Sequence, residues 1–356
     1  MRPLILNAVV VAVVVIVGVG GFFAGWELKG SSAASATSAT LSIVAAGSLA
    51  PILPTFAATF ANATPGVTDP ASAQLYEGSG NAASSLADGD QPYDVFVAAD
   101  FRTIPTSIET PAPTVASWEV VFASDPMVLA YEPGVAALSG MTSSNWWTKI
   151  VATGVTLGAP NASSDPLGAN AIFTLELEDA AQSLGGSLYS HFYAGAEGAL
   201  ATPTSATKLI SENDAATALS GGTVDVFLIY RSFAVADDLH YLNLSADVNL
   251  GGTSSANVTT YGSVATTVLS GTSTKSESGA PVLFSLTVPT TAQSRLVGIA
   301  FAAFLLANAT ATMWANYGFA PLAPAWSDHP TEVPAALTGS PAGGVALLPS
   351  YLAALV

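Results

Sequence analysis

The chain has 356 residues, about half of them hydrophobic, which is enough to bury one large or two moderate cores. Eight Lys and Arg against 25 Asp and Glu give a formal net charge of −17, which excludes nucleic acid as a partner because phosphate backbones are held by clustered basic residues. The absence of cysteine excludes disulfides, thiolate chemistry, Cys-ligated metals and a lipid-modified cysteine anchor.

An apolar run over residues 4–24, broken only by Asn7, opens the chain. It is long enough to cross a bilayer core of about 30 Å. We therefore predict a membrane-spanning signal anchor within residues 1–29, followed by a Ser/Ala/Thr linker over residues 30–40. The flanking charges show a weak positive-inside bias, which places the body of the protein at the cell membrane on its extracytoplasmic face. A cleaved signal peptide is the alternative, with its cleavage site in the linker.

Short apolar runs alternate with helical patterns after the linker. The segment "LSIVAAGSL" at residues 41–49 is typical of a buried strand ending in a Gly-Ser turn, and residues 51–64 have the apolar spacing of a helix. Strands that alternate with helices imply parallel α/β sheets, which bind ligands at the carboxyl ends of their strands. No internal repeat is evident in the sequence. Further strands are predicted at residues 94–100, 127–131, 154–160 and 224–230, and a helix at 169–184.

Residues 331–356 are aperiodic and punctuated by Pro and Gly, so we predict a Pro/Ala-rich tail outside the core.

An enzyme is not predicted. His191, His240 and His329 are far apart in the sequence, and none lies in a metal-ligand or nucleophile motif. No P-loop, Rossmann glycine fingerprint or Gly-x-Ser-x-Gly elbow is present.

Two strand-end turns combine glycine with serine: "AAGSL" at residues 45–49 and "EGSGNAASSL" at residues 77–86. Each is expected just ahead of a helix, where unpaired backbone N–H groups and the positive end of the helix dipole can bind an anion. For either turn alone, ordinary N-capping by serine is the simpler interpretation.

Six segments stand in a fixed order: "LSIVAAGSLAPILPTFAATFANATPGV", "YDVFVAADFRTIP", "FASDPMVLAYEP", "GAPNASSDPLG", "VDVFLIYRSFAVADDLHYLNLSADVNLG" and "VLFSLTVPTTAQSRLVGIAFAAFLLANATATMWANYGFAPLAP". Together they resemble the archaeal tungstate/molybdate-binding proteins of the periplasmic solute-binding class. The resemblance runs from residue 41 to residue 324. It implies an α/β, two-lobed periplasmic-binding-protein type II fold preceded by the N-terminal transmembrane helix. The implied body covers residues 41–330, with lobe 1 at 41–125 and 233–330 and lobe 2 at 126–232.

In that family the oxyanion sits between the two lobes, bound by backbone and hydroxyl donors and by two carboxylates that reach the metal centre. The basic residue and proline that usually precede the family's glutamate are replaced here by "LIS" at residues 209–211. The resemblance implies that the oxyanion is bound by Gly47, Ser48, Ser79, Asp165, Pro166, Leu167, Glu212 and Tyr230, with Asp165 and Glu212 as the ligands of the tungsten or molybdenum centre.

The two carboxylates permit a choice among oxyanions. Two ionised carboxylates would repel sulfate, whose sulfur accepts no further ligand, whereas tungsten(VI) and molybdenum(VI) can expand their coordination and accept carboxylate oxygen. Hydrogen phosphate is second, because a carboxylate can accept its proton. In the purely structural alternative, Asp165 only caps its turn and Glu212 is a surface acid that starts a helix.

We therefore expect a protein that captures tungstate or molybdate outside the cytoplasm and delivers it to an ABC permease, with no catalysis and no cofactor. The alternatives are a receptor for phosphate or another oxyanion, and a non-transporting cell-surface glycoprotein on the same fold. Only 9% of residues are charged, which also suggests an acidic exterior as a hypothesis. Possible glycosylation sites begin at Asn62, Asn161, Asn243, Asn257 and Asn308.

Overall fold

The computed structural model describes residues 38–356 except 90, 110–113, 271 and 342. The predicted N-terminal helix and nearly all of the linker lie outside these residues. The described chain divides into two compact units. The first unit holds the described residues up to Ala123 with Leu283–Asn316 and Pro321–Val356, and the second unit holds Ser124–Val282 with Tyr317–Ala320.

The first unit is built on a seven-stranded sheet with the order β18-β17-β6-β16-β5-β2-β4. Strands β4, β2 and β5 run parallel, whereas β16 runs antiparallel to β5. The strands are β2 (Ile43–Ala46), β4 (Gln74–Glu77), β5 (Val95–Ala98), β6 (Val120–Ser124), β16 (Leu283–Thr287), β17 (Ala320–Ser327) and β18 (Val345–Leu347). Because three neighbouring strands are parallel, their carboxyl ends meet at one edge of the sheet.

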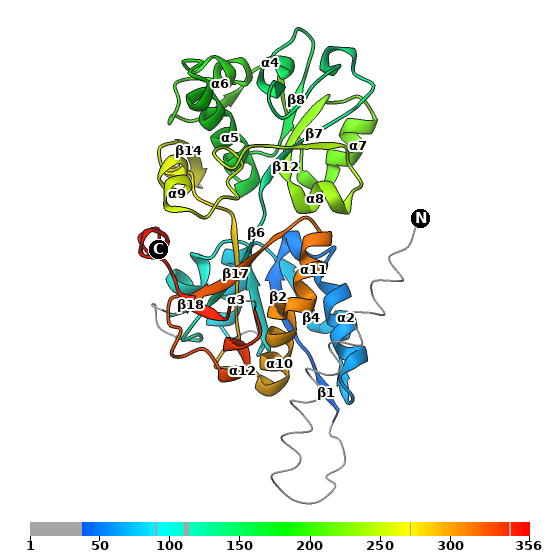
Figure 1. Ribbon diagram of the computed structural model, residues 1–356, viewed down its shortest axis with the longest axis vertical. Coiled ribbons are helices and arrows are strands. Elements are labelled where there is room, and N and C mark those ends of the chain that lie inside the picture. The colour runs from blue at the N-terminus through cyan, green and yellow to red at the C-terminus, as the bar shows by residue number, and fades with distance from the viewer. Residues whose placement is uncertain (1–37, 90, 110–113, 271, 342) are drawn as a thin grey trace, which may run out of the picture. The chain divides into compact units, whose positions relative to one another are not determined.

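Helices cover both faces of this sheet. Phe96 and Ala98 of β5 belong to an apolar cluster with α3 (Ser79–Ala87) and the π-helical turn η3 (Pro105–Glu109), while the alternate residues of β5 are also fully buried. Helix α10 (Arg295–Leu306) contacts β5 too, and it lies beside α2 (Leu53–Ala63) although the two are far apart in sequence (Figure 1). Aromatic rings join α2 to α10 and α11 (Asn308–Asn316), with centroids 4.4 Å apart for Phe56 and Trp314.

The second unit has a five-stranded sheet with the order β11-β8-β12-β7-β13. Strands β11, β8 and β12 are parallel, and β7 is antiparallel to both β12 and β13. The strands are β7 (Met127–Tyr131), β8 (Leu157–Ala159), β11 (Thr207–Leu209), β12 (Val226–Tyr230) and β13 (Tyr241–Asn243). The long helix α5 (Pro166–Gln182) contacts β7, β8 and β12, and most of its residues are buried.

Shorter elements complete the two units. The first unit adds β1 (Ala39–Thr40), η1 (Gly47–Leu49), β3 (Val67–Thr68), η2 (Ala71–Ala73), α12 (Ala335–Thr338) and α13 (Ser350–Ala353). The second adds η4 (Ala136–Leu138), α4 (Trp146–Ile150), α6 (Ser187–Phe192), β9 (Tyr193–Ala194), β10 (Thr202–Pro203), η5 (Glu212–Asp214), α7 (Ala215–Ser220), α8 (Arg231–Ala236), α9 (Ser255–Tyr261), β14 (Ala265–Ser270) and β15 (Ser273–Ser278). Within the described residues no single helix is long and apolar enough to span a membrane; α10 and α11, bent by 67°, meet that test only as a pair.

The two units share a hydrogen-bonding pattern at the beginning of two neighbouring strands. In the first unit the Asp94 carboxylate accepts from the amide and hydroxyl of Ser42 at 2.9 and 2.8 Å. In the second unit the Asp225 carboxylate accepts from the amide and hydroxyl of Thr156, both at 2.8 Å. Each aspartate stands directly before its strand, β5 or β12, in the similar sequences "DVFV" and "DVFL". The strand order β4-β2-β5-β16 thus corresponds to β11-β8-β12-β7, a repeat not evident from the sequence alone.

Two segments differ from the boundaries expected from sequence. Residues 233–282 belong to the second unit, because α9 and the β14–β15 hairpin contact α5. Residues 331–356 belong to the first unit, where β18 pairs with β17 and the side chains of Leu337 and Leu352 are fully buried. The apolar residues of this segment are therefore part of the first unit's core, although Pro and Gly interrupt their spacing.

The five possible glycosylation sites differ in accessibility. Asn257 is half-buried, and its amide nitrogen donates to the Ala246 carbonyl at 3.0 Å and to Asp247 at 3.3 Å. This nitrogen is the atom that a glycan would modify, so Asn257 is the least available of the five. The side chains of the other four are exposed: Asn62, Asn161, Asn243 and Asn308.

Candidate functional site

Three residues implied by the resemblance follow the carboxyl ends of the parallel strands in the second unit. Asp165 follows β8, Glu212 follows β11, and Tyr230 is the last residue of β12. These strands are neighbours in register, with Leu209 paired to Ala159. Their carboxyl ends therefore lie side by side, which is where α/β sheets bind ligands.

Asp165 is the N-cap of α5. Its Oδ1 accepts from the Leu167 amide at 2.9 Å, and Pro166 occupies the first helical position. Burial raises the pKa of Asp165, and the bond from the Leu167 amide opposes that rise. The capping role left open by the sequence is therefore present. This capping bond uses the N–H of Leu167 and the Oδ1 of Asp165. Oδ2 of Asp165 accepts no hydrogen bond from the described residues.

A glycine holds the loop before α5 against the first turn of the helix. A Cβ added at Gly168 would lie 2.4 Å from the Pro160 carbonyl oxygen and 2.5 Å from the Ala162 amide nitrogen. No side chain fits at such distances, so the backbone of residues 160–162 packs directly on the helix. The same loop is fixed internally by the Ser163 amide, which donates to Asn161 Oδ1 at 2.9 Å. Asp165 thus follows a turn that is held by backbone packing and by this hydrogen bond.

Glu212 opens η5 and its side chain is half-buried. Burial, together with the negative charges of Asp165 and Asp125, raises the pKa of Glu212 to about 8. Glu212 therefore faces other carboxylates and is not an isolated surface acid. With a pKa of about 8, its carboxyl group is mostly protonated at neutral pH in the ligand-free protein.

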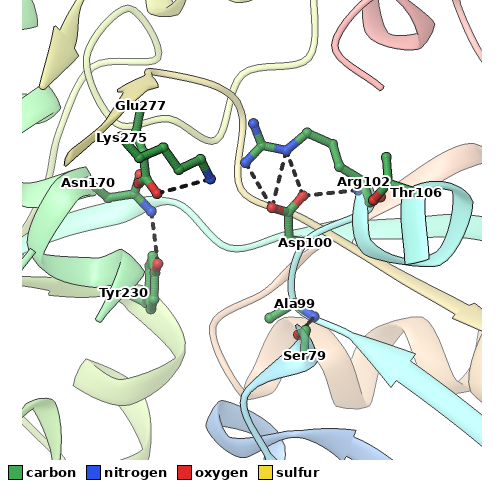
Figure 2. A network of polar contacts seen from close by, with 9 residues as sticks. All are labelled: Ser79, Ala99, Asp100, Arg102, Thr106, Asn170, Tyr230, Lys275 and Glu277. Carbon is green, nitrogen blue, oxygen red and sulfur yellow. Dashed lines mark hydrogen bonds and ion pairs between the residues drawn. The ribbon is translucent and has the colours of Figure 1, made fainter. Parts of the chain in front are cut away.

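Tyr230 is almost fully buried, with 9% of its surface exposed. The amide nitrogen of Asn170 donates to its hydroxyl oxygen at 2.8 Å (Figure 2). Burial raises the pKa of Tyr230 well above its usual value, and the charges of Glu212 and Asp165 add to that effect. The phenol therefore stays neutral, and because its oxygen accepts from Asn170, its own hydrogen remains free to be donated.

Sequence reasoning missed Asn170 and Asp125. Asn170 stands four residues after Pro166, a spacing that places both on one side of a helix. Asp125 is fully buried; its carboxylate accepts from the Ser232 amide at 3.1 Å and from the Ser232 hydroxyl. Burial raises the pKa of Asp125 to about 7, and the Ser232 bonds oppose the rise. Its only signal in the sequence is an Asp-Pro pair directly before β7.

In the first unit the Gly-Ser turn differs from expectation. Gly47–Leu49 form the short 3₁₀ turn η1, and α2 begins only at Leu53, so Gly47 and Ser48 do not stand directly before that helix. The turn follows β2 at the carboxyl edge of the sheet. The Ser48 hydroxyl oxygen is buried and has no hydrogen-bond partner among the described residues. A buried hydroxyl without a partner is uncommon, and it is free to bind a ligand.

The second serine matches expectation more closely. Ser79 is the first residue of α3 and follows the neighbouring strand β4, whose Glu77 pairs with Ala46. Its hydroxyl oxygen accepts from the Ala99 amide at 3.0 Å (Figure 2). Ala99 follows β5, so this bond links two strand ends. As in Tyr230, the hydroxyl hydrogen remains available for donation.

A basic side chain also lies after β5. The guanidinium of Arg102 donates to both carboxylate oxygens of Asp100, from Nε at 2.9 and 3.1 Å and from Nη2 at 2.8 Å (Figure 2). Both side chains are 40% exposed. Because the pair is bidentate, the positive charge of Arg102 is balanced by Asp100 and its guanidinium is held in position after β5.

A comparison with protein families bears on this architecture. The model of the bacterial extracellular solute-binding proteins matches residues 41–320. The chain belongs to this family. Extracellular solute-binding proteins act outside the cytoplasm, where they bind a solute for an ABC transporter and do not catalyse a reaction.

Individual relatives agree with this assignment. An uncharacterized solute-binding protein of Methanoculleus marisnigri is 28% identical over 73% of this chain and 76% of its own length. The molybdate/tungstate-binding protein WtpA of Thermococcus kodakarensis is 26% identical over 64% of this chain and 66% of its own length. Among solved structures, a substrate-binding domain from Clostridium difficile, assigned to a molybdenum ABC transporter, covers 80% of this chain and 99% of its own at 15% identity. Its TM-score of 0.52 supports the α/β periplasmic-binding fold.

Proposed function

We propose that this solute-binding protein captures tungstate or molybdate for an ABC importer. The observation that carries the proposal is the gathering of Asp165, Glu212 and Tyr230 at the carboxyl ends of three parallel strands in the second unit. A molybdate/tungstate-binding relative, WtpA of Thermococcus kodakarensis, supports the same choice. The proposed set also includes Ser48 and Ser79, whose hydroxyls lie at the equivalent strand ends of the first unit.

The chemistry of these groups suits an oxyanion with an expandable centre. The hydroxyls of Ser79 and Tyr230 can donate to the anion's oxygens because both accept a hydrogen bond from their own unit. Carboxylate oxygens of Asp165 and Glu212 are hard ligands of the kind that tungsten(VI) and molybdenum(VI) accept. Gly47, Pro166 and Leu167 shape the turns that carry these side chains, and they complete the proposed set.

Hydrogen phosphate is the second candidate. A pKa of about 8 leaves Glu212 mostly protonated at neutral pH, and a neutral carboxylic acid can donate a hydrogen bond to any oxyanion without expanding its coordination. In that case Asp165 would accept the proton of the bound phosphate. The two candidates differ in how affinity changes with pH: it should rise with pH if Glu212 ligates tungsten and fall if Glu212 donates a hydrogen bond to phosphate.

Calorimetric titration of the protein with tungstate, molybdate, phosphate and sulfate tests the proposal. We expect tungstate and molybdate to bind at one site per chain and to bind more tightly than phosphate or sulfate. Ligand that binds only the folded state raises the melting temperature, so saturating tungstate should do the same. If neither tungstate nor molybdate changes the melting curve at millimolar concentration, the proposal is wrong.

Substitutions of Asp165 and Glu212 test whether these carboxylates bind the metal centre. Asp165→Asn keeps the shape of the cap but removes the charge, so we expect tungstate affinity to fall at least about tenfold, or about 1.4 kcal/mol. Glu212→Gln should act in the same direction, and the double variant should be non-additive because both residues would bind one centre. Asp238→Asn and Asp214→Asn are the controls, since both aspartates are exposed. Unchanged or tighter binding in both site variants would exclude ligation by this pair.

A further inference from the structure

A second cluster of polar residues lies in the first unit, outside the proposed oxyanion site. Glu109 ends η3, Asp328 and His329 follow β17, and Glu119 stands directly before β6. Strands β17 and β6 are neighbours in the sheet. The Glu119 amide donates to Asp328 Oδ1 at 3.1 Å, which ties the two strand ends together.

Three of these residues present ligand atoms to a common point. The ligand atoms of Glu109, Asp328 and His329 all lie within 4.8 Å of one another. Nε2 of His329 is 4.0 Å from Glu109 Oε2 and 3.8 Å from Asp328 Oδ2. The Glu109 and Asp328 side chains are only 7% and 17% exposed, whereas His329 is 59% exposed. The group is therefore mostly buried and is open to solvent on the histidine side.

Buried oxygens without partners give an independent indication of a ligand. Oε1 of Glu109 is buried and has no hydrogen-bond partner among the described residues. Glu119 is fully buried, and neither of its carboxylate oxygens has such a partner. The buried hydroxyl of Ser285 also has no hydrogen-bond partner among the described residues. Buried carboxylate oxygens left in this way are costly, and a bound cation would satisfy them.

The arrangement of charged groups around the cluster leads to the same conclusion. The carboxyl groups of Glu109 and Asp328 both lie beside the His329 imidazole, and the amide of Glu119 donates to the Asp328 carboxylate. A divalent cation held between two carboxyl groups and an imidazole would balance the negative charge of the two acids.

We propose that Glu109, Asp328 and His329 form a binding site for a divalent transition-metal ion of the Zn²⁺ or Mn²⁺ class, with Glu119 as a buried outer carboxylate. One imidazole nitrogen with two carboxylates is a mixed donor set. Such a set suits zinc and manganese, whereas calcium and magnesium favour ligands that are all oxygen. The exposed His329 side chain lies at the solvent side, where the ion would enter.

Calorimetry of the untagged, chelator-treated full chain with ZnCl₂, MnCl₂ and CaCl₂ tests this site without any oxyanion present. We expect one Zn²⁺ or Mn²⁺ ion per chain, with Ca²⁺ binding at least about tenfold more weakly. His329→Gln should lower the affinity for the transition metal at least about tenfold. His240→Gln, which replaces another exposed histidine, should leave that affinity unchanged.

A second readout covers the buried ligands, whose replacement could disturb folding. Zn²⁺ or Mn²⁺ should raise the melting temperature of the unaltered protein and of His240→Gln, because the ion binds only the folded state, but not that of His329→Gln or Asp328→Asn. Binding of Zn²⁺ that is equally tight with and without His329 would overturn the proposal. So would the failure of both ions to bind, which would mean that the acids share protons instead.

Discussion

At the residue scale, the hydroxyls of Ser79 and Tyr230 have the same arrangement in two different units. Each oxygen accepts a hydrogen bond from an N–H of its own unit, at 3.0 Å from Ala99 and 2.8 Å from Asn170. The bond fixes the position of the oxygen and leaves the hydroxyl hydrogen unused. In each unit the hydroxyl is therefore oriented before any ligand binds, so donation from it would cost little side-chain entropy.

The pH dependence of binding distinguishes the two roles of Glu212. If Glu212 ligates tungsten as a carboxylate, it must lose a proton, so affinity should rise by up to about tenfold per pH unit below its pKa of about 8. We expect this rise between pH 6.5 and pH 8 in tungstate titrations, and we expect Glu212→Gln to remove it. Affinity that falls as the pH rises through 8 would instead identify Glu212 as a neutral hydrogen-bond donor and would favour phosphate.

Part of this site could be predicted from the sequence. The Asp-Pro turn at Asp165 and the Gly-Ser pair at Ser79 consist of residue types that are typical of helix starts, so the sequence itself indicates them as candidate anion-binding turns. Asn170 and Asp125 could not be assigned in this way, because each acquires its role through a partner distant in the sequence, Tyr230 and Ser232. The protonation state of Glu212 also depends on burial, which no local pattern reports.

At the element scale, five strands were predictable, including the antiparallel β7, but the parallel strand β11 and the repetition of the arrangement were not. Short apolar runs bounded by turns identified β2, β5, β7, β8 and β12. The repeat rests on Asp94 and Asp225, each bonded to a hydroxyl residue before a neighbouring strand. Only "DVF" is identical in the two copies, which is too short to signal a repeat. Strand β18 was missed for a related reason, since its three residues become a strand only by pairing with β17.

The close packing of α5 on its preceding loop can be tested by adding a single methyl group at Gly168. Gly168→Ala would place a Cβ 2.4 Å from the Pro160 carbonyl, so the loop must move away from the helix. We expect a loss of about 1–3 kcal/mol in the free energy of unfolding, together with weaker tungstate binding because Asp165 moves with the loop. Urea denaturation and calorimetry measure the two effects.

Gly80→Ala in α3 is the matched control for this change. Gly80 also lies in the first turn of a helix, but an added Cβ there meets nothing within 4 Å. Replacing a helical glycine by alanine at an open position stabilises by about 0.5–1 kcal/mol. Equal effects of the two substitutions would show that the loop does not rest on Gly168.

At the scale of the whole molecule, buried carboxyl groups recur in both units. Burial is the largest cause of a raised pKa for Glu109 at about 9, for Asp125, Glu176 and Glu178 at about 7, and for Glu212 at about 8. The pKa of Glu119 is raised as well. A net charge of −17 with only eight basic residues leaves few cations to pair with these acids. Burial therefore favours the protonated form of these groups in the folded protein.

The stability of the protein without bound oxyanion or metal ion should consequently fall as the pH rises. Each of these carboxyls has a folded-state pKa above its unfolded value of about 4, so the folded state holds more protons across the interval between the two values. The free energy of unfolding therefore decreases from about pH 4.5 to pH 8.5, and each loss of about 1 kcal/mol lowers the melting temperature by about 2–4 °C. Thermal scans at constant ionic strength measure this slope. Glu176→Gln mimics the protonated side chain, so it should raise the melting temperature at pH 8.5 but not at pH 4.5, whereas Glu332→Gln at an exposed position should do neither. A melting temperature that stays constant or rises across this interval would contradict the assignment of these acids as protonated in the folded state.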